Sequence, residues 1–156
     1  MRLTIINKGQ AGFVFGALAV ALVFCGLTAC KQESKPKIIR HIDHSWEKDI
    51  GYAETVEVNG TVYISGVACA GETYAIAVPD CYRQLKEKLD NLHLTTQNIV
   101  KENVYAKDID AFKEQIPARK AFYGNANYPA GSWVQVSRLY TPEYLVEVEL
   151  IAVRTE

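Results

Sequence analysis

Apolar and polar residues alternate on both sides of a two-residue turn in the middle of the chain. The turn is Asn59-Gly60, and the apolar positions around it recur at every second residue: Val56, Val58, Val62 and Ile64. An Asn-Gly pair between alternating apolar residues is the strongest short-range signal for a β-hairpin. The pattern therefore predicts two strands, near 53–58 and 61–68.

Two later segments have helical periodicity. In the first, near 78–92, Leu85, Leu89 and Leu92 recur at helical spacing opposite a charged face. Asp108 is placed to cap a second helical stretch. The apolar side of that stretch is formed by Ile109, Phe112, Ile116 and Phe122. Pro117 lies inside it, so we expect a kink or a new helical segment there.

Three more apolar segments read as strands, at 99–106, 133–139 and 145–153. The order is ββαβαββ, with room for a short strand before the hairpin. This order predicts an α+β fold in which two helices cover one face of a mixed sheet. Apolar residues also point to the opposite face, and self-association would cover them.

The N-terminal segment, 1–29, is typical of a secretory signal: Arg2 and Lys8 precede an apolar run. It ends in Leu27-Thr28-Ala29-Cys30, which resembles a bacterial lipobox, with lipid attached to Cys30. An uncleaved membrane-spanning anchor is the alternative. We expect a lipidated tether at 30–38 and a folded domain at 39–156. The lipoprotein would face the periplasm, on the outer membrane rather than the inner one, because Lys31 is not the aspartate associated with inner-membrane retention.

The charge balance argues against nucleic acid as a partner. Of the 17 Lys and Arg residues, Arg2 and Lys8 leave with the leader, so 15 remain against 18 Asp and Glu, a net charge of −3. The chain has no run of basic residues that would bind a phosphate backbone.

Two of the four cysteines, Cys69 and Cys81, remain after loss of Cys25 and acylation of Cys30. In an oxidising compartment these two are expected to form a disulfide. Two buried free thiols, or one reactive thiol, are the alternatives.

The C-terminal third carries the motif Tyr128-Pro129-Ala130-Gly131-Ser132-Trp133, and Val62-Tyr63-Ile64-Ser65-Gly66 lies in the hairpin. These segments resemble the RidA family, also called YjgF or L-PSP. The resemblance implies a chorismate-mutase-like fold and a homotrimer with a ligand cleft at each subunit boundary. Neither a cofactor nor a metal is implied. His41 and His44 alone make a weak metal signal.

The resemblance also implies site residues. In enzymatic members an arginine binds the substrate carboxylate and a glutamate activates water to hydrolyse an imine or enamine. Tyr52, Ser65 and Glu147 match cleft residues of the family. Gly131 stands at the arginine position and Trp133 at a cysteine position. Ile116 replaces an asparagine.

Two other arginines could supply the missing cation from a different backbone position. Arg138 falls in the predicted strand 133–139, where a structural salt bridge is the expected role. Arg119 follows Pro117 beside Lys120, where we expect it to be solvated. Glu147 and Glu149 share one face of the last strand, either in the cleft or paired across a subunit boundary.

The sequence thus predicts a cleft that binds a small molecule other than a 2-imino acid, because Gly131 cannot clamp a carboxylate. Two alternatives remain open. One is an imine or enamine deaminase in which Glu147 activates water. The other is a structural protein of the cell envelope.

Overall fold

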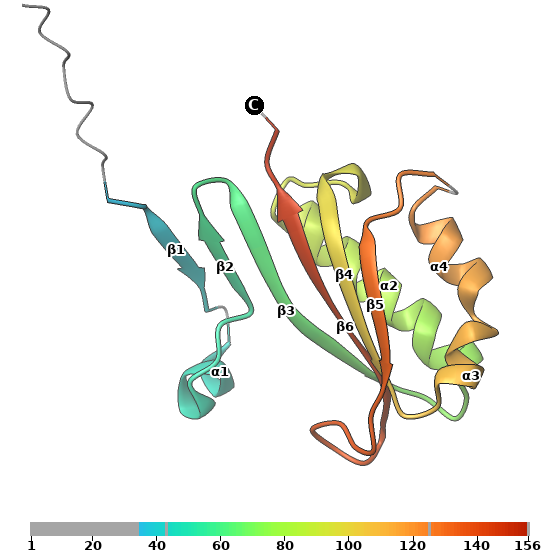
Figure 1. Cartoon of the computed structure of the whole chain (residues 1–156). Helices are drawn as coiled ribbons and strands as arrows, with labels where there is room; N and C mark the ends of the chain where they lie inside the picture. The colour runs from blue at the N-terminus through green and yellow to red at the C-terminus, as the bar shows by residue number, and fades with distance from the viewer. Residues whose placement is uncertain (1–34, 43, 125, 156) are drawn as a thin grey trace, which may run out of the picture. The chain divides into compact units, whose positions relative to one another are not determined.

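A six-stranded mixed sheet organises the chain in this computed structural model, which describes residues 35–42, 44–124 and 126–155 (Figure 1). The predicted leader and Cys30 lie outside the described residues. Along the sheet the strand order is β1-β2-β3-β6-β4-β5. The strands are β1 (Ile38–His41), β2 (Thr55–Val58), β3 (Thr61–Ala70), β4 (Ile99–Ala106), β5 (Ala130–Gln135) and β6 (Tyr144–Val153). Only the β4–β5 pair is parallel among these strands.

The β2–β3 hairpin confirms the Asn-Gly prediction. Val58 pairs with Thr61 across the turn, and both turn residues have positive φ, 49° at Asn59 and 78° at Gly60. Two successive positive φ angles match the right-handed twist of the flanking strands, and Asn-Gly adopts them at little cost.

Helix α2 (Tyr74–Asn91) crosses behind the sheet in Figure 1, with α3 (Ile109–Lys113) and α4 (Ile116–Phe122) to the right of β5, and the three helices pack on one face of the sheet. Helix α2 begins before the predicted residue 78. Ala77 is completely buried, so its first turn also contributes to the core. Pro79 lies exposed in the second turn of the helix, where it cannot donate the usual hydrogen bond to the carbonyl four residues earlier.

The second predicted helix is divided in two, as Pro117 indicated. Helix α4 starts with the proline in its first turn, where a missing N–H is tolerated. The Asp108 cap on α3 is also present: its carboxylate accepts hydrogen bonds from the backbone N–H groups of Asp110 and Ala111, both at 3.0 Å.

The structure contains β1, the short strand for which the predicted order left room, and adds the short helix α1 (Ser45–Ile50) and a 3-10 turn at Thr96–Asn98. The last two strands follow each other in sequence but do not pair. Strand β6 lies between β3 and β4, because four of its side chains need helices above them: Val146, Val148, Leu150 and Ala152, which are at most 1% exposed. Strand β5 is left at the edge of the sheet, parallel to β4. The predicted α+β class and mixed sheet are confirmed.

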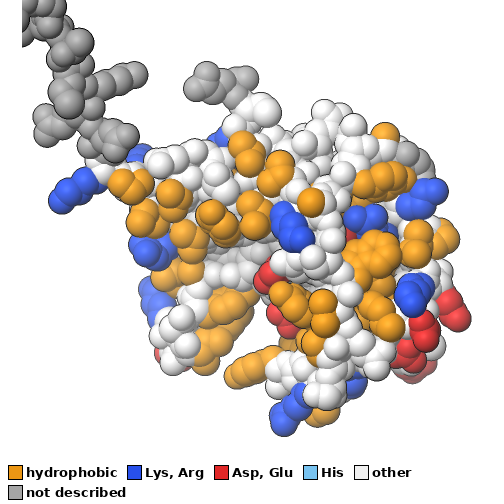
Figure 2. Space-filling model, viewed as in Figure 1, with side chains coloured by type: hydrophobic (Ala, Val, Ile, Leu, Met, Phe, Trp, Pro, Cys, Tyr) orange, Lys and Arg blue, Asp and Glu red, His pale blue; other side chains and the backbone are white. Residues whose placement is uncertain are grey.

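Helices α2, α3 and α4 leave the other face of the sheet uncovered. Three exposed apolar side chains point outward there: Tyr63 on β3, Val134 on β5 and Val153 on β6. Figure 2 views this open face and shows hydrophobic side chains gathered over it around a hollow. None of the described helices is both long and apolar enough to span a bilayer.

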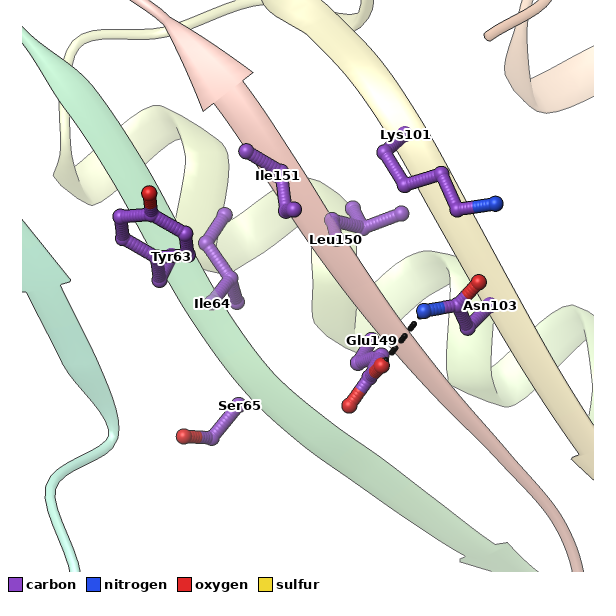
Figure 3. Close-up of a pocket in the computed structure, with 8 residues that line it drawn as sticks. All are labelled: Tyr63, Ile64, Ser65, Lys101, Asn103, Glu149, Leu150 and Ile151. Carbon is purple, nitrogen blue, oxygen red and sulfur yellow. Dashed lines mark hydrogen bonds between the residues drawn. The ribbon is translucent and has the colours of Figure 1, made fainter. Parts of the chain in front are cut away.

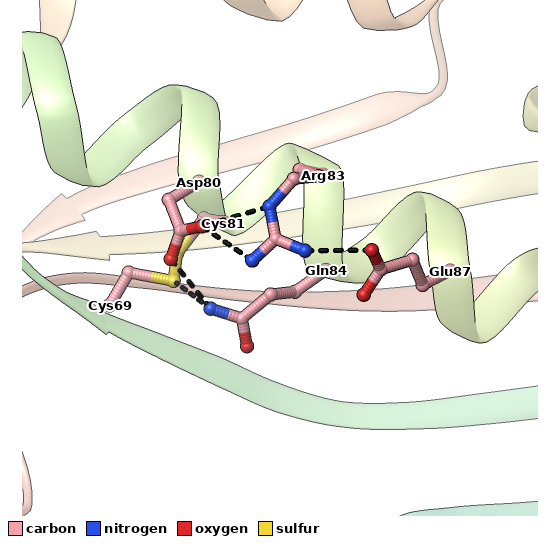
Figure 4. Close-up of polar contacts among 6 residues, drawn as sticks. All are labelled: Cys69, Asp80, Cys81, Arg83, Gln84 and Glu87. Carbon is pink, nitrogen blue, oxygen red and sulfur yellow. Dashed lines mark hydrogen bonds and ion pairs between the residues drawn. A yellow bond between two sulfur atoms is a disulfide. The ribbon is translucent and has the colours of Figure 1, made fainter.

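Cys69 on β3 and Cys81 on α2 lie together as a disulfide, with Cα atoms 5.6 Å apart (Figure 4). Both residues are buried. Around them, Gln84 donates to Asp80 at 2.7 Å, and Arg83 bridges Asp80 and Glu87 on the exposed side of α2. The disulfide joins α2, the longest of the described helices, to β3 near the middle of the sheet.

Replacing Cys69 and Cys81 together with alanine is expected to lower the free energy of unfolding by about 3 kcal/mol, because the crosslink of a short loop constrains the unfolded chain. Urea denaturation measures the loss. Dithiothreitol should destabilise the wild type and leave the variant unchanged. Two alkylatable thiols in the non-reduced protein would contradict the bridge.

Candidate functional site

A completely buried carboxylate lies under one end of the sheet. Glu102 shares a face of β4 with Val104 and Ala106, because strand side chains alternate, and this face meets the helices. Its Oε1 accepts hydrogen bonds from the hydroxyls of Tyr82 and Tyr123, each at 3.0 Å. Its Oε2 accepts from Nε of Arg119 at 2.7 Å and Nε1 of Trp133 at 3.3 Å.

Four donors from three elements and a helix end satisfy this charge. Burying an ion pair is costly, and removing one partner of such a pair typically destabilises a protein by about 3–5 kcal/mol. Burial, and then the negative charge of Glu102, raise the pKa of Tyr82 and of Tyr123 well above the usual range. Both hydroxyls therefore stay protonated and remain donors.

Arg119 is not solvated, contrary to the prediction. It is 6% exposed, and its guanidinium carbon lies 4.9 Å from the ring centre of Tyr123, 5.0 Å from Trp133 and 5.7 Å from Tyr128. The prediction was wrong because a seven-residue helix has too few turns for its sequence to show which side is covered. The carboxylate and the rings draw this cation inward.

The same guanidinium reaches the place beside Gly131. A Cβ atom at residue 131 would lie 3.4 Å from Nε1 of Trp133 and 4.0 Å from Nη2 of Arg119. An open pocket is lined here by Arg119, Tyr128, Pro129, Gly131 and Trp133, which we call the aromatic pocket. A cation from α4 therefore stands where the motif on β5 lacks one.

A second group of side chains gathers around β3 and β6, and we call it the glutamate group: Tyr52, Ser65 and Glu147. The hydroxyl of Ser65 donates to the carbonyl of Ala53 at 2.8 Å, and the hydroxyl of Tyr52 lies 3.4 Å from the carbonyl of Gly66. A methyl group on Gly66 would lie 2.7 Å from Cδ of Glu147, so the glycine makes room for this carboxylate.

The surroundings of Glu147 and Tyr52 shift the pKa values of both side chains. Burial, followed by repulsion from Glu149, raises the pKa of Glu147. Burial also raises the pKa of Tyr52, while its hydrogen bond with Ser65 opposes that shift. A carboxyl group whose pKa is raised toward neutrality is suited to proton transfer.

Glu149 has a different environment. Its carboxylate accepts hydrogen bonds from Nδ2 of Asn103 at 2.6 Å and from the hydroxyl of Tyr105 at 3.1 Å. Figure 3 shows it pointing toward Asn103 in a pocket that Ser65 and Lys101 also line. Partners within its own chain therefore satisfy Glu149.

The aromatic pocket and the glutamate group lie on opposite faces of the sheet. Glu147 is opposite Tyr105 on the open face, whereas Gly131 is opposite Glu102 on the helix-covered face. One copy of the chain therefore cannot bring the two groups into one cavity.

Arg138 is in neither group. It was predicted inside a strand, but β5 ends at Gln135, where its pairing with Ala106 on β4 ends. Arg138 follows in an exposed loop and makes no ion pair with a described residue. Ile116 lies at the start of α4, partly buried.

The residues that sequence reasoning missed were the buried acid and its tyrosines. Glu102 stands at the alternating position shared with Val104 and Ala106, on the buried side of an apolar strand. An acid in that register is a signal for a buried partner, and no such signal pointed to Tyr82 or Tyr123. His41 lies on β1 and His44 caps α1; no three metal-binding side chains cluster within the described ranges.

Comparison with known proteins places this geometry in a family. Residues 44–154 match the family described as Endoribonuclease L-PSP. A RutC family protein from Pyrococcus abyssi is 29% identical over 114 residues, which are 67% of this chain and 88% of the relative. Another RutC family protein, from Haemophilus influenzae, is 29% identical over 113 residues, 66% of this chain and 86% of the relative.

Solved structures agree with the sequence comparisons. A member of the YjgF/YER057c/UK114 family from Mycobacterium tuberculosis has a TM-score of 0.68 and 25% identity, over 76% of this chain and 100% of that one. A YjgF family protein from Neisseria meningitidis has a TM-score of 0.67 and 25% identity, over 77% and 97%. The chain therefore belongs to the Endoribonuclease L-PSP family, the RidA or YjgF family that its C-terminal motif resembles.

Proposed function

We propose that this protein binds a small molecule in a cleft formed between two copies of the chain. The observation that carries the proposal is the placement of the aromatic pocket and the glutamate group on opposite faces of one sheet. A cavity that uses both groups needs Trp133 and Arg119 from one copy and Glu147 from the next. The pocket lies at the edge strand β5, where a neighbouring copy can approach.

Self-association of the open face supports this arrangement. Tyr63 is 48% and Val134 is 47% exposed on the sheet face that α2, α3 and α4 leave uncovered. Burial of such apolar side chains against a second copy is favourable. We propose the homotrimer of the family as the functional unit.

A 2-imino acid is a poor candidate for the ligand. Gly131 contributes no side chain, and the Arg119 guanidinium already has a carboxylate partner in Glu102 at 2.7 Å. A free arginine fork could hold a substrate carboxylate in two parallel hydrogen bonds with full charge attraction. In this chain the Glu102 carboxylate already offsets much of the positive charge of Arg119.

Hydrolysis of an imine or enamine without a carboxylate is the second candidate. It is favoured by the raised pKa of Glu147, beside Ser65 and Tyr52. In this function Glu147 takes a proton from an attacking water. An envelope protein with a structural role remains the outcome if the cleft binds nothing. RNA is disfavoured as a ligand because the chain is slightly acidic, with a formal charge of −1.

The N-terminus supports a place in the cell envelope. We propose that lipid on Cys30 anchors the protein to the outer membrane and that the domain faces the periplasm. The Leu27-Thr28-Ala29-Cys30 motif after an apolar run supports this assignment.

The shared cleft can be tested by mixing two variants. Glu147→Ala and Trp133→Ala are each expected to abolish binding in native mass spectrometry against a metabolite panel, whereas trimers refolded from a mixture should regain part of it. Recovery is expected because some boundaries then combine an intact pocket with an intact glutamate. No recovery from well-folded mixed trimers would place both groups in separate sites.

Catalysis is tested with 2-iminobutanoate as substrate. The wild type is expected to hydrolyse it no faster than Glu147→Gln does. Gly131→Arg alone should not create the activity, because its side chain would start 4.0 Å from the Arg119 guanidinium and face a like charge. Rapid hydrolysis by the wild type that Glu147→Gln removes would overturn the proposal in favour of a deaminase.

The raised pKa of Glu147 predicts a pH-dependent effect on stability. The folded state binds the proton of the Glu147 carboxyl more tightly than the unfolded state does. The stabilisation that this proton provides is therefore fully present below the usual carboxyl pKa and is lost as the pH rises through the raised pKa of Glu147. Glu147→Gln should therefore gain stability relative to the wild type in urea denaturation as the pH rises from the usual carboxyl pKa through the raised one. Glu143→Gln is the control, since the pKa of Glu143 is lowered. A pH-independent difference would mean that Glu147 titrates normally.

Lipidation is tested by metabolic labelling with a clickable palmitate. The wild type is expected to incorporate the label and to fractionate with outer membranes, and Cys30→Ala should do neither. Label that persists in Cys30→Ala would exclude this cysteine as the attachment site.

A further inference from the structure

The aromatic pocket contains a guanidinium with an open hydrogen-bonding edge. The Arg119 side chain is only 8% exposed, and its Nε donates to Glu102. Its Nη1 and Nη2 atoms make no hydrogen bond to any described residue, although they belong to a cation that is more than nine-tenths buried. Two parallel N–H donors are thus available to a ligand in the pocket.

Glu102 sets the charge that this edge presents. A ligand carboxylate at the Nη atoms would be attracted by the guanidinium and repelled by the Glu102 carboxylate, whose Oε2 lies 2.7 Å from Nε of Arg119, so the repulsion would offset part of the attraction. An ionised ligand would also lose its hydration on entering. A neutral carbonyl oxygen accepts the same hydrogen bonds without either disadvantage.

The walls of the pocket favour a flat molecule. Trp133 and Tyr128 are 37% and 44% exposed, and the Arg119 guanidinium lies against both rings. Gly131 leaves the floor free of any side chain. Exposed aromatic rings bind planar ligands by stacking, while a few polar groups fix their orientation.

We propose that the aromatic pocket selects a neutral, planar ligand that presents carbonyl oxygens to Nη1 and Nη2 of Arg119, such as an amide, an imide or a cyclic urea. This inference rests on the proposed function, since it names the ligand class of the same cleft. Glu102 acts as a positioning residue: it holds Arg119 in place and offsets its charge.

A matched pair of probes tests the ligand class. Benzamide and benzoate have the same ring and differ in charge, and Trp46→Phe leaves Trp133 as the only tryptophan of the two in the chain. Trp46 is half exposed and lies outside the pocket. In fluorescence titrations of this variant at neutral pH, benzamide is expected to bind at least about tenfold more tightly than benzoate.

Charge at residue 102 provides the second test. Glu102→Gln keeps the shape, and the tyrosine hydroxyls can accept from its amide nitrogen because a hydroxyl both donates and accepts. Removal of the negative charge should shift the preference toward benzoate by about tenfold. Arg119→Gln should lose both probes. Lys120→Gln, on the exposed side of the same helix, is the matched control and should change neither affinity.

The outcomes separate the two proposals. Tighter binding of benzoate than benzamide to the wild-type pocket would overturn the neutral ligand class and leave small-molecule binding intact. Binding of neither probe, with adducts still found in the metabolite panel, would also overturn the ligand class alone. The absence of every adduct would overturn the proposed function. If Glu102→Gln does not fold, the ratio of benzamide to benzoate affinity in the protein that keeps Glu102 decides whether the pocket prefers a neutral ligand.

Discussion

The buried Glu102 carboxylate is the interaction on which the described domain most depends. It lies on β4, next to the edge strand β5, and accepts hydrogen bonds from α2, α4, β5 and the residue after α4. Each donor fixes the element that carries it, so one charge sets where α4 lies over β4 and β5. A charge this deep is stable only with all of its partners, because hydration is no longer available to it.

The same interaction changes the chemistry of the aromatic pocket. The family motif places a cation on β5, but this chain has Gly131 there and supplies a guanidinium from Arg119 on α4. An arginine on an edge strand would extend freely toward a ligand. An arginine on α4 is instead locked by Glu102 and covered by aromatic rings, with one edge exposed. The Arg119 guanidinium thus keeps a hydrogen-bonding edge beside Gly131, whereas Glu102 offsets much of its charge.

The sheet explains why a site that used both groups would need more than one chain. Glu147 and Gly131 project from opposite faces, and the backbone between them cannot be crossed by a ligand. The open face therefore supports both parts of the proposal. Its apolar side chains favour self-association, and the same contact would carry Glu147 of one copy toward the aromatic pocket of another. Gly66 contributes by leaving space for the Glu147 carboxylate.

Local patterns in the sequence determined the local structure. Asn59-Gly60 fixed the hairpin, Asp108 the start of α3 and Pro117 the start of α4, because each acts through its own backbone. The pattern 99–106 gave the bounds of β4, and the family motif identified Gly131 as the altered position.

Tertiary structure decided what depends on distant partners. The insertion of β6 between β3 and β4 could not be read from neighbouring residues, since it follows from which strand needs helices on its inner face. The direction of Arg119 depended on Glu102, 17 residues earlier in the chain. The sequence of a helix as short as α4 does not show which of its sides is buried. The buried opposite charge of Glu102 decides this for Arg119. The sequence alone thus determined that residue 131 offers no cation, and the packing of α4 decided that the Arg119 guanidinium lies beside it.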